Sequence, residues 1–467
     1  MATPNTHFGA KNIELMLNEC KSIYFIGIGG INMSSLAHIS FLRGYRTGGS
    51  DRERTALTEK LREEGIEVFY SHSAENVDNY DAVVYTVAIS PDNPEYVRAQ
   101  ERGIPCISRA DYLGYLMLGY ENRIGVSGMH GKSTCTSMCA TVFMNGGADP
   151  TVLSGAELDA MGGAYRIGKS ENFIFEACEY MDSFLDFNPS VAIILNIELD
   201  HVDYFASIEQ ICRSYSKFAS ITGKDGTVIA NADNEYIPVA LEGYEGRVIT
   251  FGISTGSADY TAINIRYPAG FAEFDVMHNE EFLCHVKLSV TGEHNVYNAL
   301  AAFAAGHISG IEPEKIALGL SQFRGAKRRM ELKGTVNGAM VFDDYGHHPT
   351  EVATTLNGVA KRDVQRVFCV FQPHTFTRTY TLMDDFAKSF DAVDRVFIAD
   401  IYPARETDNL GISGKTLAQR IGDKAEYISG FENIAKEINS LLYPGDVLVV
   451  MGAGDIYKLF DYLGFDE

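Results

Sequence analysis

Short apolar runs that alternate with helical patterns recur along almost the entire chain. Representative runs are IYFIG (23–27), SVAIILN (190–196) and DVLVVMG (446–452). Each has the length of a buried strand, and polar or glycine-rich residues follow it. This alternation predicts an α/β architecture with largely parallel sheets. In open sheets of this kind, ligands bind in the loops that follow the carboxyl ends of the strands.

The length of 467 residues exceeds what one hydrophobic core supports, so we expect several domains. The apolar runs fall into three blocks, which predict domains at residues 1–120, 121–325 and 326–467. Within the second block, residues 248–294 are richer in short strands and polar turns. This region indicates a small antiparallel insertion or the edge of a sheet.

Composition limits the classes of partner. The formal net charge is -23, whereas binding to a phosphate backbone needs a basic surface, so we expect no nucleic-acid partner. A few placed cations and helix N-termini can still bind a small anionic ligand. The N-terminus lacks a secretion signal, no apolar run is long enough to cross a bilayer, and the eight cysteines form no CxxC pair. We therefore expect a cytoplasmic protein without membrane insertion.

The segment GVSGMHGKST (125–134) combines a strand end, a glycine-rich turn and the start of a helix. Glycines let backbone amides surround a phosphate, Lys132 would reach the β and γ oxygens, and Ser133 would offer its hydroxyl to Mg²⁺. The strict pattern GxxxxGK[ST] fails because Val126 stands at its first glycine. A glycine-rich turn with a surface lysine is the alternative, but the context of strand, loop and helix favours phosphate binding.

An earlier glycine loop, IGIGG (26–30), follows the first apolar run. An acid about twenty residues later, Asp51, makes it look like the turn of a dinucleotide-binding domain. However, Asn32 replaces the third glycine of the GxGxxG pattern. A nicotinamide-dependent oxidoreductase is therefore kept as an alternative, although it would leave the later phosphate loop without a purpose.

Two strands after the phosphate loop end in polar residues. These residues are Glu176, Glu179, Asn196, Glu198, Asp200 and His201. If both strands flank the phosphate-loop strand, Glu176 and His201 can approach Ser133. Carboxylate oxygens suit Mg²⁺, and a histidine joins such a site less often. Solvated acidic loops are the alternative.

Further polar residues lie in later loops and at a helix start. Three histidines follow later apolar runs: His347, His348 and His374. The basic cluster GAKRRM (325–330) lies at a predicted domain junction, where a cation could swing onto an ATP phosphate. Asn295 and Asn298 share one face of a helix start, where they could cap the helix or recognise a base.

The order of the motifs is more specific than any single motif. The motifs are IGIGGINMSSLA, GSD, AISPDNPE, RGIPCISRADYL, SGMHGKST, EACE, NIELDHVDYF, NAD, TGEHNVYNALAA, FRGAKRRMEL, DDYGHHPTEV, FQPHTFTRT and MGAGDI. With these collinear motifs the chain resembles the Mur ligase family of peptidoglycan synthesis. The resemblance implies a Rossmann-like UDP-sugar domain (1–120), a central P-loop ATPase-type domain with a parallel sheet (121–325) and a Rossmann-like amino-acid domain (326–467).

The resemblance also implies roles for individual residues. Catalysis falls to Lys132, Glu176, His201 and Arg329, and the metal ligands are Ser133, Glu176 and His201. ATP is expected to contact Gly128, His130, Gly131, Lys132, Ser133, Thr134, His294, Asn295, Asn298, Arg329 and Asp344. The UDP-sugar is expected at Gly27, Gly29, Gly30, Asn32, Ser50 and Asp51. The amino acid is expected at Tyr345, His348, His374 and Arg378.

The implied reaction is an ATP-dependent amide ligation. With ATP and Mg²⁺, the lactyl carboxylate of UDP-N-acetylmuramate would become an acyl phosphate, which the amine of L-alanine attacks, releasing ADP and phosphate. A ligase that attaches a ready-made tripeptide to the same sugar nucleotide is the nearest alternative, and a non-catalytic nucleotide sensor is a remote one. A homodimer is left open.

The chain departs from the family pattern at several positions. Met129 stands where the family usually has threonine, and Cys178 replaces an aspartate, which leaves the role of Glu179 open. Thr375 occupies a position that is often arginine, so the clamp on the amino acid's carboxylate is undetermined. Lys217 lies near the position of a carbamylated lysine in other members, although a surface lysine on a helix is the favoured interpretation.

Overall fold

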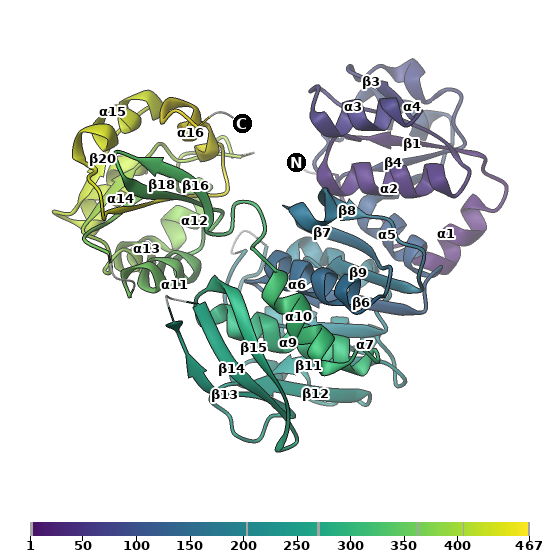
Figure 1. Ribbon diagram of the computed structural model, residues 1–467. Helices are drawn as coiled ribbons and strands as arrows, with labels where there is room; N and C mark the ends of the chain where they lie inside the picture. Colours follow the sequence, from purple (N-terminus) through teal and green to yellow (C-terminus); the bar gives the residue numbers. More distant parts are fainter. Residues whose placement is uncertain (1–2, 202–203, 269–270, 362–363, 405, 466–467) are drawn as a thin grey trace.

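The computed structural model describes residues 3–201, 204–268, 271–361, 364–404 and 406–465. Three β-sheets follow one another along the chain (Figure 1). Most neighbouring strands within them are parallel, which confirms the predicted α/β class. The predicted domain boundaries, between residues 120 and 121 and between 325 and 326, fall between sheets and stay predictions. Among the described residues, no helix has both the length and the apolar composition needed to cross a bilayer.

The first sheet is fully parallel, in the order β3-β2-β1-β4-β5. Its strands are β1 (Ser22–Ile26), β2 (Arg46–Ser50), β3 (Glu67–Phe69), β4 (Ala82–Tyr85) and β5 (Cys106–Ser108). Its helices are α1 (Ala10–Leu17), α2 (Ile31–Leu42), α3 (Ala56–Glu63), α4 (Pro94–Glu101) and α5 (Arg109–Met117), with a 3₁₀ turn η1 (Ala74–Val77). The strand order reverses between β1 and β4, so the glycine loop that follows β1 lies at the crevice where such sheets bind ligands.

The second sheet has the order β15-β14-β13-β12-β11-β10-β6-β9-β7-β8. Its strands are β6 (Asn122–Ser127), β7 (Thr151–Leu158), β8 (Gly163–Arg166), β9 (Asn172–Glu176), β10 (Val191–Ile194), β11 (Thr227–Asn231), β12 (Arg247–Gly252), β13 (Tyr260–Arg266), β14 (Phe271–His278) and β15 (Glu281–Thr291). Its helical segments are α6 (Lys132–Asn145), α7 (Ile208–Ile221), α8 (Ile237–Ala240), α9 (His294–Ile308), α10 (Pro313–Gln322), η2 (Asp159–Met161) and η3 (Tyr180–Asp186).

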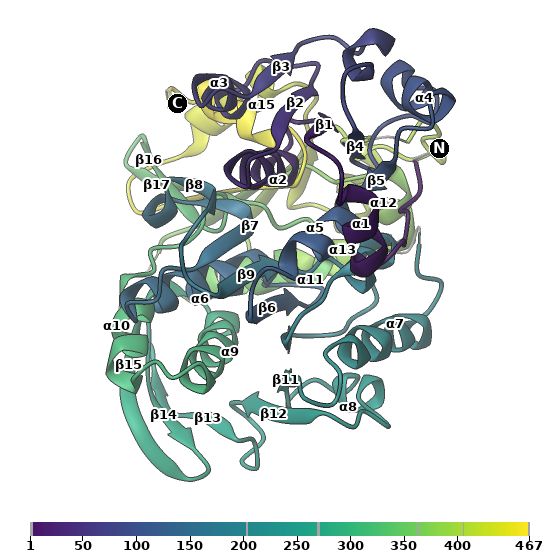
Figure 2. The ribbon, with the colours of Figure 1, turned by 90° about the vertical axis from the view of Figure 1, so that its right-hand side faces the viewer.

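Two predictions are confirmed in this sheet. The phosphate-loop strand β6 lies between β10 and β9, so the loops that carry the predicted metal ligands meet at one edge. The strand-rich region is a sheet edge, where β13, β14 and β15 pair antiparallel. Figures 1 and 2 show this edge at the opposite end of the molecule from the first sheet.

The third sheet has the order β16-β17-β21-β18-β19-β20 and is parallel except for the pair β16–β17. Its strands are β16 (Glu331–Val336), β17 (Ala339–Asp344), β18 (Val367–Phe371), β19 (Arg395–Ile398), β20 (Ala425–Tyr427) and β21 (Val447–Met451). Its helical segments are α11 (Pro349–Ala360), α12 (Phe376–Thr381), α13 (Met383–Ser389), α14 (Gly414–Ile421), α15 (Phe431–Leu441), η5 (Ile456–Lys458) and α16 (Leu459–Tyr462).

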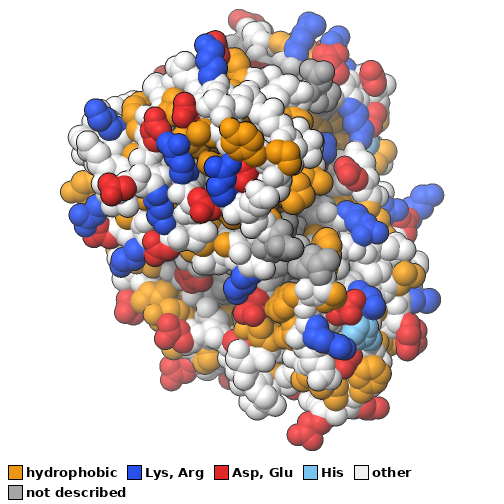
Figure 3. All heavy atoms as spheres, turned by 60° about the vertical axis from the view of Figure 1, so that its left-hand side comes forward, with side chains coloured by type: hydrophobic (Ala, Val, Ile, Leu, Met, Phe, Trp, Pro, Cys, Tyr) orange, Lys and Arg blue, Asp and Glu red, His pale blue; other side chains and the backbone are white. Residues whose placement is uncertain are grey.

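The apolar cores join the domains unequally. One continuous cluster runs from Ile13 and Phe25 beside the first sheet to Phe175 and Phe218 beside the second. The third sheet instead has clusters of its own on its two faces, and their described members all lie after residue 329. The face drawn in Figure 3 intersperses acidic and basic side chains. Apolar burial therefore ties the first two domains together, whereas the C-terminal domain needs other contacts.

Candidate active site

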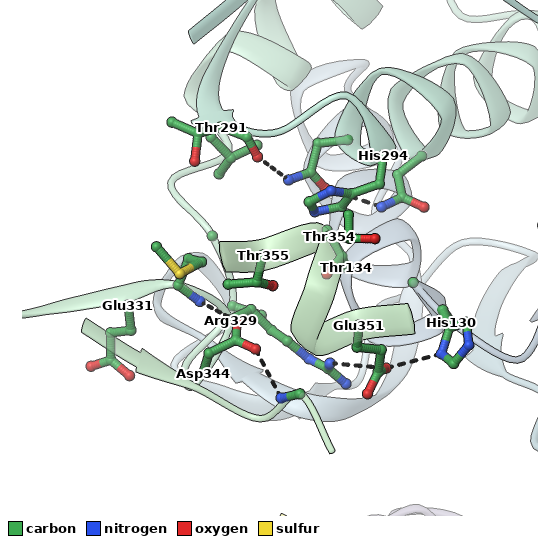
Figure 4. Close-up of a pocket in the computed structure, with 18 of the residues that line it drawn as sticks. His130, Thr134, Thr291, His294, Arg329, Glu331, Asp344, Glu351, Thr354 and Thr355 are labelled. Atoms are coloured by element: carbon green, nitrogen blue, oxygen red, sulfur yellow. Dashed lines mark hydrogen bonds and ion pairs between the residues drawn. The ribbon is translucent and has the colours of Figure 1, made fainter. Parts of the chain in front are cut away.

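A cavity of about 740 Å³ lies between the second sheet and the C-terminal domain, a size typical of small-molecule sites (Figure 4). Its lining comes from the phosphate loop, the start of α9, the linker that precedes β16, and α11. Among the lining residues are eight that the sequence assigned to ATP: His130, Gly131, Thr134, His294, Asn295, Asn298, Arg329 and Asp344. Residues far apart in the sequence thus meet at one cavity, which supports the expected nucleotide site.

The phosphate loop is held by contacts on both sides. Asn196, at the end of β10, accepts a hydrogen bond from the amide of His130 at 2.9 Å and donates to its carbonyl at 3.0 Å. Gly131 has φ +85°, and a Cβ there would lie 2.7 Å from Oδ1 of Asn298 on α9. The next residue, Lys132, begins α6, so the N-terminus of a 14-residue helix faces the cavity, where it favours an anion.

Glu179 binds two of the predicted catalytic residues. Its carboxylate lies 3.1 Å from Nζ of Lys132 and 2.9 Å from Nε2 of His201, and it is fully buried. Burial alone would raise the pKa of Glu179, but the charge of Lys132 and the hydrogen bond from His201 lower it. The charged carboxylate therefore fixes both side chains. This assigns a position to the residue whose role the sequence left open.

The predicted metal ligands divide into two groups. Ser133 donates its hydroxyl to Glu176 at 2.8 Å, and the amide of Gly155 donates to the same carboxylate oxygen at 2.9 Å. His201 is paired with Glu179 instead, and no contact joins it to Glu176 among the described residues. The hydroxyl and carboxylate oxygens fit a hard cation such as Mg²⁺. The placement of His201 as a ligand stays a prediction.

A second group of potential ligands, His130, Glu198 and His348, has donor atoms within 4.8 Å of one another. His130 also lies 3.1 Å from Glu351 and 3.5 Å from Glu198. Burial opposes the charge, but these two carboxylates raise the pKa of His130 to about 10. A protonated imidazole has no lone pair for a metal, so we interpret this group as an ion-pair cluster between the central and C-terminal domains.

The start of α9 forms the other end of the cavity. Asn295 donates to the carbonyl of Thr291 at 2.8 Å, and Asn298 donates to Asn295 at 3.0 Å. Burial, and then the charge of Arg329, lower the pKa of His294 to about 4, so its ring is neutral at pH 7. A neutral ring and two amide side chains that line the same cavity suit a nucleotide base, which supports the predicted adenine side.

Arg329 and Asp344 enter the cavity from the C-terminal domain (Figure 4). The carboxylate of Asp344 accepts amide hydrogen bonds from Met330 and Gly346 at 2.9 and 2.8 Å, and burial raises its pKa to about 6. Arg329 lies 4.0 Å from Glu351, which in turn contacts His130. Glu351 was not predicted, because its position in HPTE indicates only the start of a helix.

The region predicted to bind the amino acid contains a buried interdomain ion pair. The guanidinium of Arg378 donates to Asp200 at 3.0 and 3.3 Å, and both side chains are almost inaccessible. Burial would raise the pKa of Asp200, but Arg378 holds it well below its usual range. The predicted carboxylate contact Arg378 is therefore already paired with Asp200, a residue that the sequence placed only in a loop.

The other residues predicted for the amino acid are spread around this ion pair. His374 stacks on Tyr402 with ring centroids 5.6 Å apart, whereas His348 lies against the ring of His130 at 4.9 Å. The ring of Tyr345 lies under Arg329 at 5.2 Å. His347, which was not assigned, lies beside His374, with ring centroids 5.7 Å apart. The assignment of these residues stays a prediction.

The residues predicted for the UDP-sugar meet at the end of β1. The amides of Gly27 and Gly29 are already bonded, to the carbonyl of Ser50 at 2.8 Å and to Asp51 at 2.9 Å. The first-turn amides of α2, around Asn32, are therefore the donors left for a diphosphate. The hydroxyl of Ser50 is fully buried and donates to Glu95 at 2.6 Å, so a direct ligand contact there needs a rearrangement.

The departures from the family pattern have local explanations. Met129 is buried in the apolar cluster that joins the first two domains. Thr375 is the N-cap of α12, where its hydroxyl accepts from the amide of Arg378, so it supports the helix that carries this arginine. Burial, and then Glu179, raise the pKa of the Cys178 thiol to about 11. Lys217 is exposed on α7, as the surface interpretation expects.

Sequence profiles of Mur ligases match three consecutive parts of the chain. The profile described as "Mur ligase family, catalytic domain" matches residues 22–121, "Mur ligase middle domain" matches 126–306, and "Mur ligase, glutamate ligase domain" matches 328–454. Together they cover most of the sequence.

Individual relatives agree over nearly their whole length. The chain is 45% identical to a UDP-N-acetylmuramate–L-alanine ligase of Caldanaerobacter subterraneus subsp. tengcongensis, over 96% of this chain and 98% of that one. It is 44% identical to the enzyme of that name in Clostridium tetani, over 95% and 98%. Among solved structures, UDP-N-acetylmuramate-alanine ligase MurC from Thermotoga maritima superposes with a TM-score of 0.80 at 29% identity, covering 95% and 98% of the two chains. A murein peptide ligase from Psychrobacter arcticus superposes at 0.72 with 25% identity, covering 96% and 99%.

Proposed function

This chain belongs to the Mur ligase family, and from that premise we propose that it joins L-alanine to the lactyl carboxylate of UDP-N-acetylmuramate at the expense of ATP. The observation that carries the proposal is the agreement, over at least 95% of this chain, with several relatives that bear this activity as their name. The murein peptide ligase is the less similar structure, so a tripeptide substrate is not favoured. The cavity at the phosphate loop leaves no reason to retain an oxidoreductase.

The first step is transfer of the γ-phosphoryl group of ATP to the lactyl carboxylate. Most of its catalysis is positioning and charge stabilisation, because the transferring group carries charge on three oxygens. The residues at the N-terminus of α6 line the cavity from the central domain, and Arg329 lines it from the C-terminal domain. Lys132, whose ammonium donates to the carbonyls of Gly128 and Met129 and to Glu179, is the proposed contact of the γ-phosphate. Asn295 and Asn298 hold the far end of the nucleotide.

Ser133 and Glu176 are the proposed ligands of Mg²⁺, with His201 as the third. An ion held by these residues would neutralise phosphate charge and polarise the carboxylate. Glu179 orients His201 and Lys132 through its contacts with both side chains. Gly155 supports Glu176 from the neighbouring strand β7.

The second step is attack of the neutral amine of L-alanine on the acyl phosphate. Arg378 is the proposed carboxylate contact, and Tyr345, His348 and His374 are the proposed lining. The ion pairs that close the C-terminal domain over the phosphate loop exclude water, which would otherwise hydrolyse the acyl phosphate. The N-terminal domain would hold the UDP moiety at the start of α2.

The proposed setting is the cytoplasm, where ATP is available and cysteines stay reduced. The eight cysteines are all unpaired in the structure, as a reducing compartment requires. The sequence left a homodimer open, and light scattering of the purified protein at several concentrations measures the oligomeric state directly.

Phosphate release tests the proposal. The purified protein is incubated with ATP, Mg²⁺ and UDP-N-acetylmuramate, and L-alanine, glycine, L-serine or a tripeptide is added in separate reactions. We expect the highest kcat/KM with L-alanine. Stimulation by none of the amino acids sinks the proposal, and a preference for the tripeptide favours the alternative ligase.

Alanine substitutions of two lysines, one in the phosphate loop and one on the surface, test the assigned phosphate loop, and the surface variant is the control. Lys132→Ala is expected to abolish turnover, because the γ-phosphate loses its cation, whereas Lys217→Ala, on the exposed face of α7, is expected to leave turnover unchanged. Retained turnover in Lys132→Ala counts against the assigned phosphate loop.

A further inference from the structure

Arg109 differs from the other basic residues in the described part of the chain. It is the first residue of α5 and is half-buried, yet it makes no hydrogen bond, ion pair or ring contact with any described residue. Every other described lysine or arginine that is not exposed has a carboxylate or carbonyl partner, such as Asp78 for Arg98 and Asp200 for Arg378. A cation withdrawn from water without a partner is costly, which indicates that a ligand supplies the partner.

The carboxylates near Arg109 make their hydrogen bonds with other groups, although Oδ2 of Asp186 is buried and has no hydrogen-bond partner. Asp111 accepts hydrogen bonds from the N-terminal segment at 2.6 to 3.0 Å. Asp186 binds His7 at 2.6 Å, and Glu176 accepts from Ser133 and Gly155. Burial lowers the pKa of Arg109, although Asp186 and Glu176 act in the opposite direction. These acids therefore act on Arg109 from a distance, and no described carboxylate forms an ion pair with it.

The location of Arg109 connects two parts of the proposed site. It follows β5, at the carboxyl edge of the first sheet, where the glycine loop also lies. The helix that it begins packs tightly on the segment that follows Glu176, because a Cβ on Gly114 would lie only 1.9 Å from the carbonyl oxygen of Asp186. Figures 1 and 2 show α5 beside the central domain. Arg109 thus begins a helix that is packed on the central domain, and Asp186 and Glu176 of that domain act on its charge.

Building on the proposed function, we propose that Arg109 binds the lactyl carboxylate of UDP-N-acetylmuramate and holds it toward Glu176 for phosphorylation. A planar guanidinium matches a carboxylate with two parallel hydrogen bonds. The diphosphate of the same substrate offers related anionic chemistry, but it belongs at the N-terminus of α2. The proposal adds a contact from the N-terminal domain to the acyl-transfer end of the site.

Binding of two sugar nucleotides distinguishes a contact with the lactyl carboxylate from a contact with the diphosphate. UDP-N-acetylglucosamine has the diphosphate but no lactyl group, so calorimetry with both ligands is run on the wild type, Arg109→Met and Arg109→Lys. We expect Arg109→Met to bind UDP-N-acetylmuramate about 10- to 100-fold more weakly, with Arg109→Lys in between and UDP-N-acetylglucosamine unchanged. Equal losses for both ligands, or no loss for either, would overturn the assignment.

Arg98→Met is the matched control, because Arg98 lies in the same domain and is paired with Asp78. It is expected to bind both ligands like the wild type. The steady-state assay separates this inference from the proposed function. A wild type that forms no product with L-alanine refutes the proposed function, whereas an active wild type with an unchanged KM for UDP-N-acetylmuramate in Arg109→Met overturns only the role of Arg109.

Thermal unfolding distinguishes a ligand contact from a structural role. Removal of an unpaired, half-buried charge is expected to leave the unfolding temperature of the ligand-free protein unchanged or raised. The rise caused by UDP-N-acetylmuramate is expected to be smaller in Arg109→Met than in the wild type. A lower ligand-free unfolding temperature combined with an unchanged ligand-induced rise would overturn the proposal.

Discussion

At the scale of single residues, Glu179 shows how a buried carboxylate can arrange a site without touching the substrate. It is fully buried and contacts both Lys132 and His201. Without its charge, the lysine would lose its counter-ion in a desolvated place, and the histidine would lose its orientation. The proposed positions of both catalytic groups therefore depend on one acid.

Glu179→Gln keeps the size of the side chain and removes its charge. We expect kcat to fall roughly 10- to 100-fold, since a hydrogen bond to a charged group contributes about 1.5–3 kcal/mol. Glu245→Gln is the control, because Glu245 pairs with Lys224 on the exposed surface of the same domain. Steady-state kinetics with saturating ATP measure the effect, and equal kcat values for both variants would contradict it.

The raised pKa of His130 leads us to expect that the stability of the folded protein depends on pH. Its pKa is about 10 in the folded protein, because Glu198 and Glu351 outweigh burial, and about 6.5 in an unfolded chain. The folded protein thus binds an extra proton between these values. The resulting stabilisation is complete below about pH 6.5 and is lost as the pH rises toward 10.

Unfolding temperatures of the wild type and His130→Gln, measured from pH 6 to pH 10, check this sign. The wild type is expected to exceed the variant most at pH 6, and the difference is expected to shrink as the pH rises. A difference that stays constant, or grows with pH, would rule out a protonated His130.

At the scale of elements, the junction of the phosphate loop with α6 depends on a glycine. Gly131 has φ +85°, and any Cβ there would collide with Asn298 on α9. Gly147, just after the same helix, has φ +84° but nothing within 4 Å of a Cβ. The two glycines share the backbone requirement, and only Gly131 has the close neighbour.

Alanine substitutions at these two glycines distinguish the cost of backbone strain from the cost of a steric clash with Asn298. Alanine at either position costs about 1–2 kcal/mol of stability, because a side chain disfavours the left-handed region. Only Gly131→Ala is expected to weaken ATP binding as well, by at least tenfold, because the loop must shift away from α9. Calorimetric titration with a non-hydrolysable ATP analogue measures this, and equal losses of affinity would show that the collision with Asn298 is unimportant.

The helices, strands and loops could be predicted from the sequence better than the contacts between distant side chains. The glycine loop after β1, the phosphate loop before α6 and the strands on either side of β6 follow from local apolar patterns and turn residues. Contacts between distant segments do not, because no local pattern specifies which side chain faces which. Arg378 and Asp200 are 178 residues apart, and the sequence around either residue does not indicate that the two are in contact. Ser50 shows the reverse case, since a motif suggested a ligand contact and the pleat of β2 directs the hydroxyl into a buried bond with Glu95.

At the scale of the whole molecule, two joints differ in kind. The N-terminal and central domains share one apolar cluster, whereas the C-terminal domain contacts the central domain through polar groups. Those contacts include Arg378 with Asp200, Glu351 with His130, and Thr350 with Glu198 at 3.0 Å. We therefore expect the C-terminal domain to be the part that opens for substrates and closes for chemistry.

Asp200→Asn tests this joint. Loss of one charge from a buried pair costs about 3–5 kcal/mol, which is enough to shift the closed form toward an open one. We expect a larger radius of gyration in small-angle X-ray scattering. Glu426→Gln, in an exposed pair within the C-terminal domain, is expected to scatter like the wild type. Identical scattering from Asp200→Asn would show that other contacts hold the domains together.

Because one interdomain interface is apolar and the other is polar, ionic strength should affect the two interfaces differently. Mobile ions screen exposed charges over about 8 Å at physiological ionic strength, and they weaken apolar association little. As the C-terminal domain opens, its ion pairs become exposed to those ions, and the apolar joint remains dry. Rising salt should thus favour the open form and raise the KM for the amino acid, which depends on closure, more than that for the sugar nucleotide. By the same reasoning, a rise in the salt concentration around this ligase would slow the step that consumes the acyl phosphate.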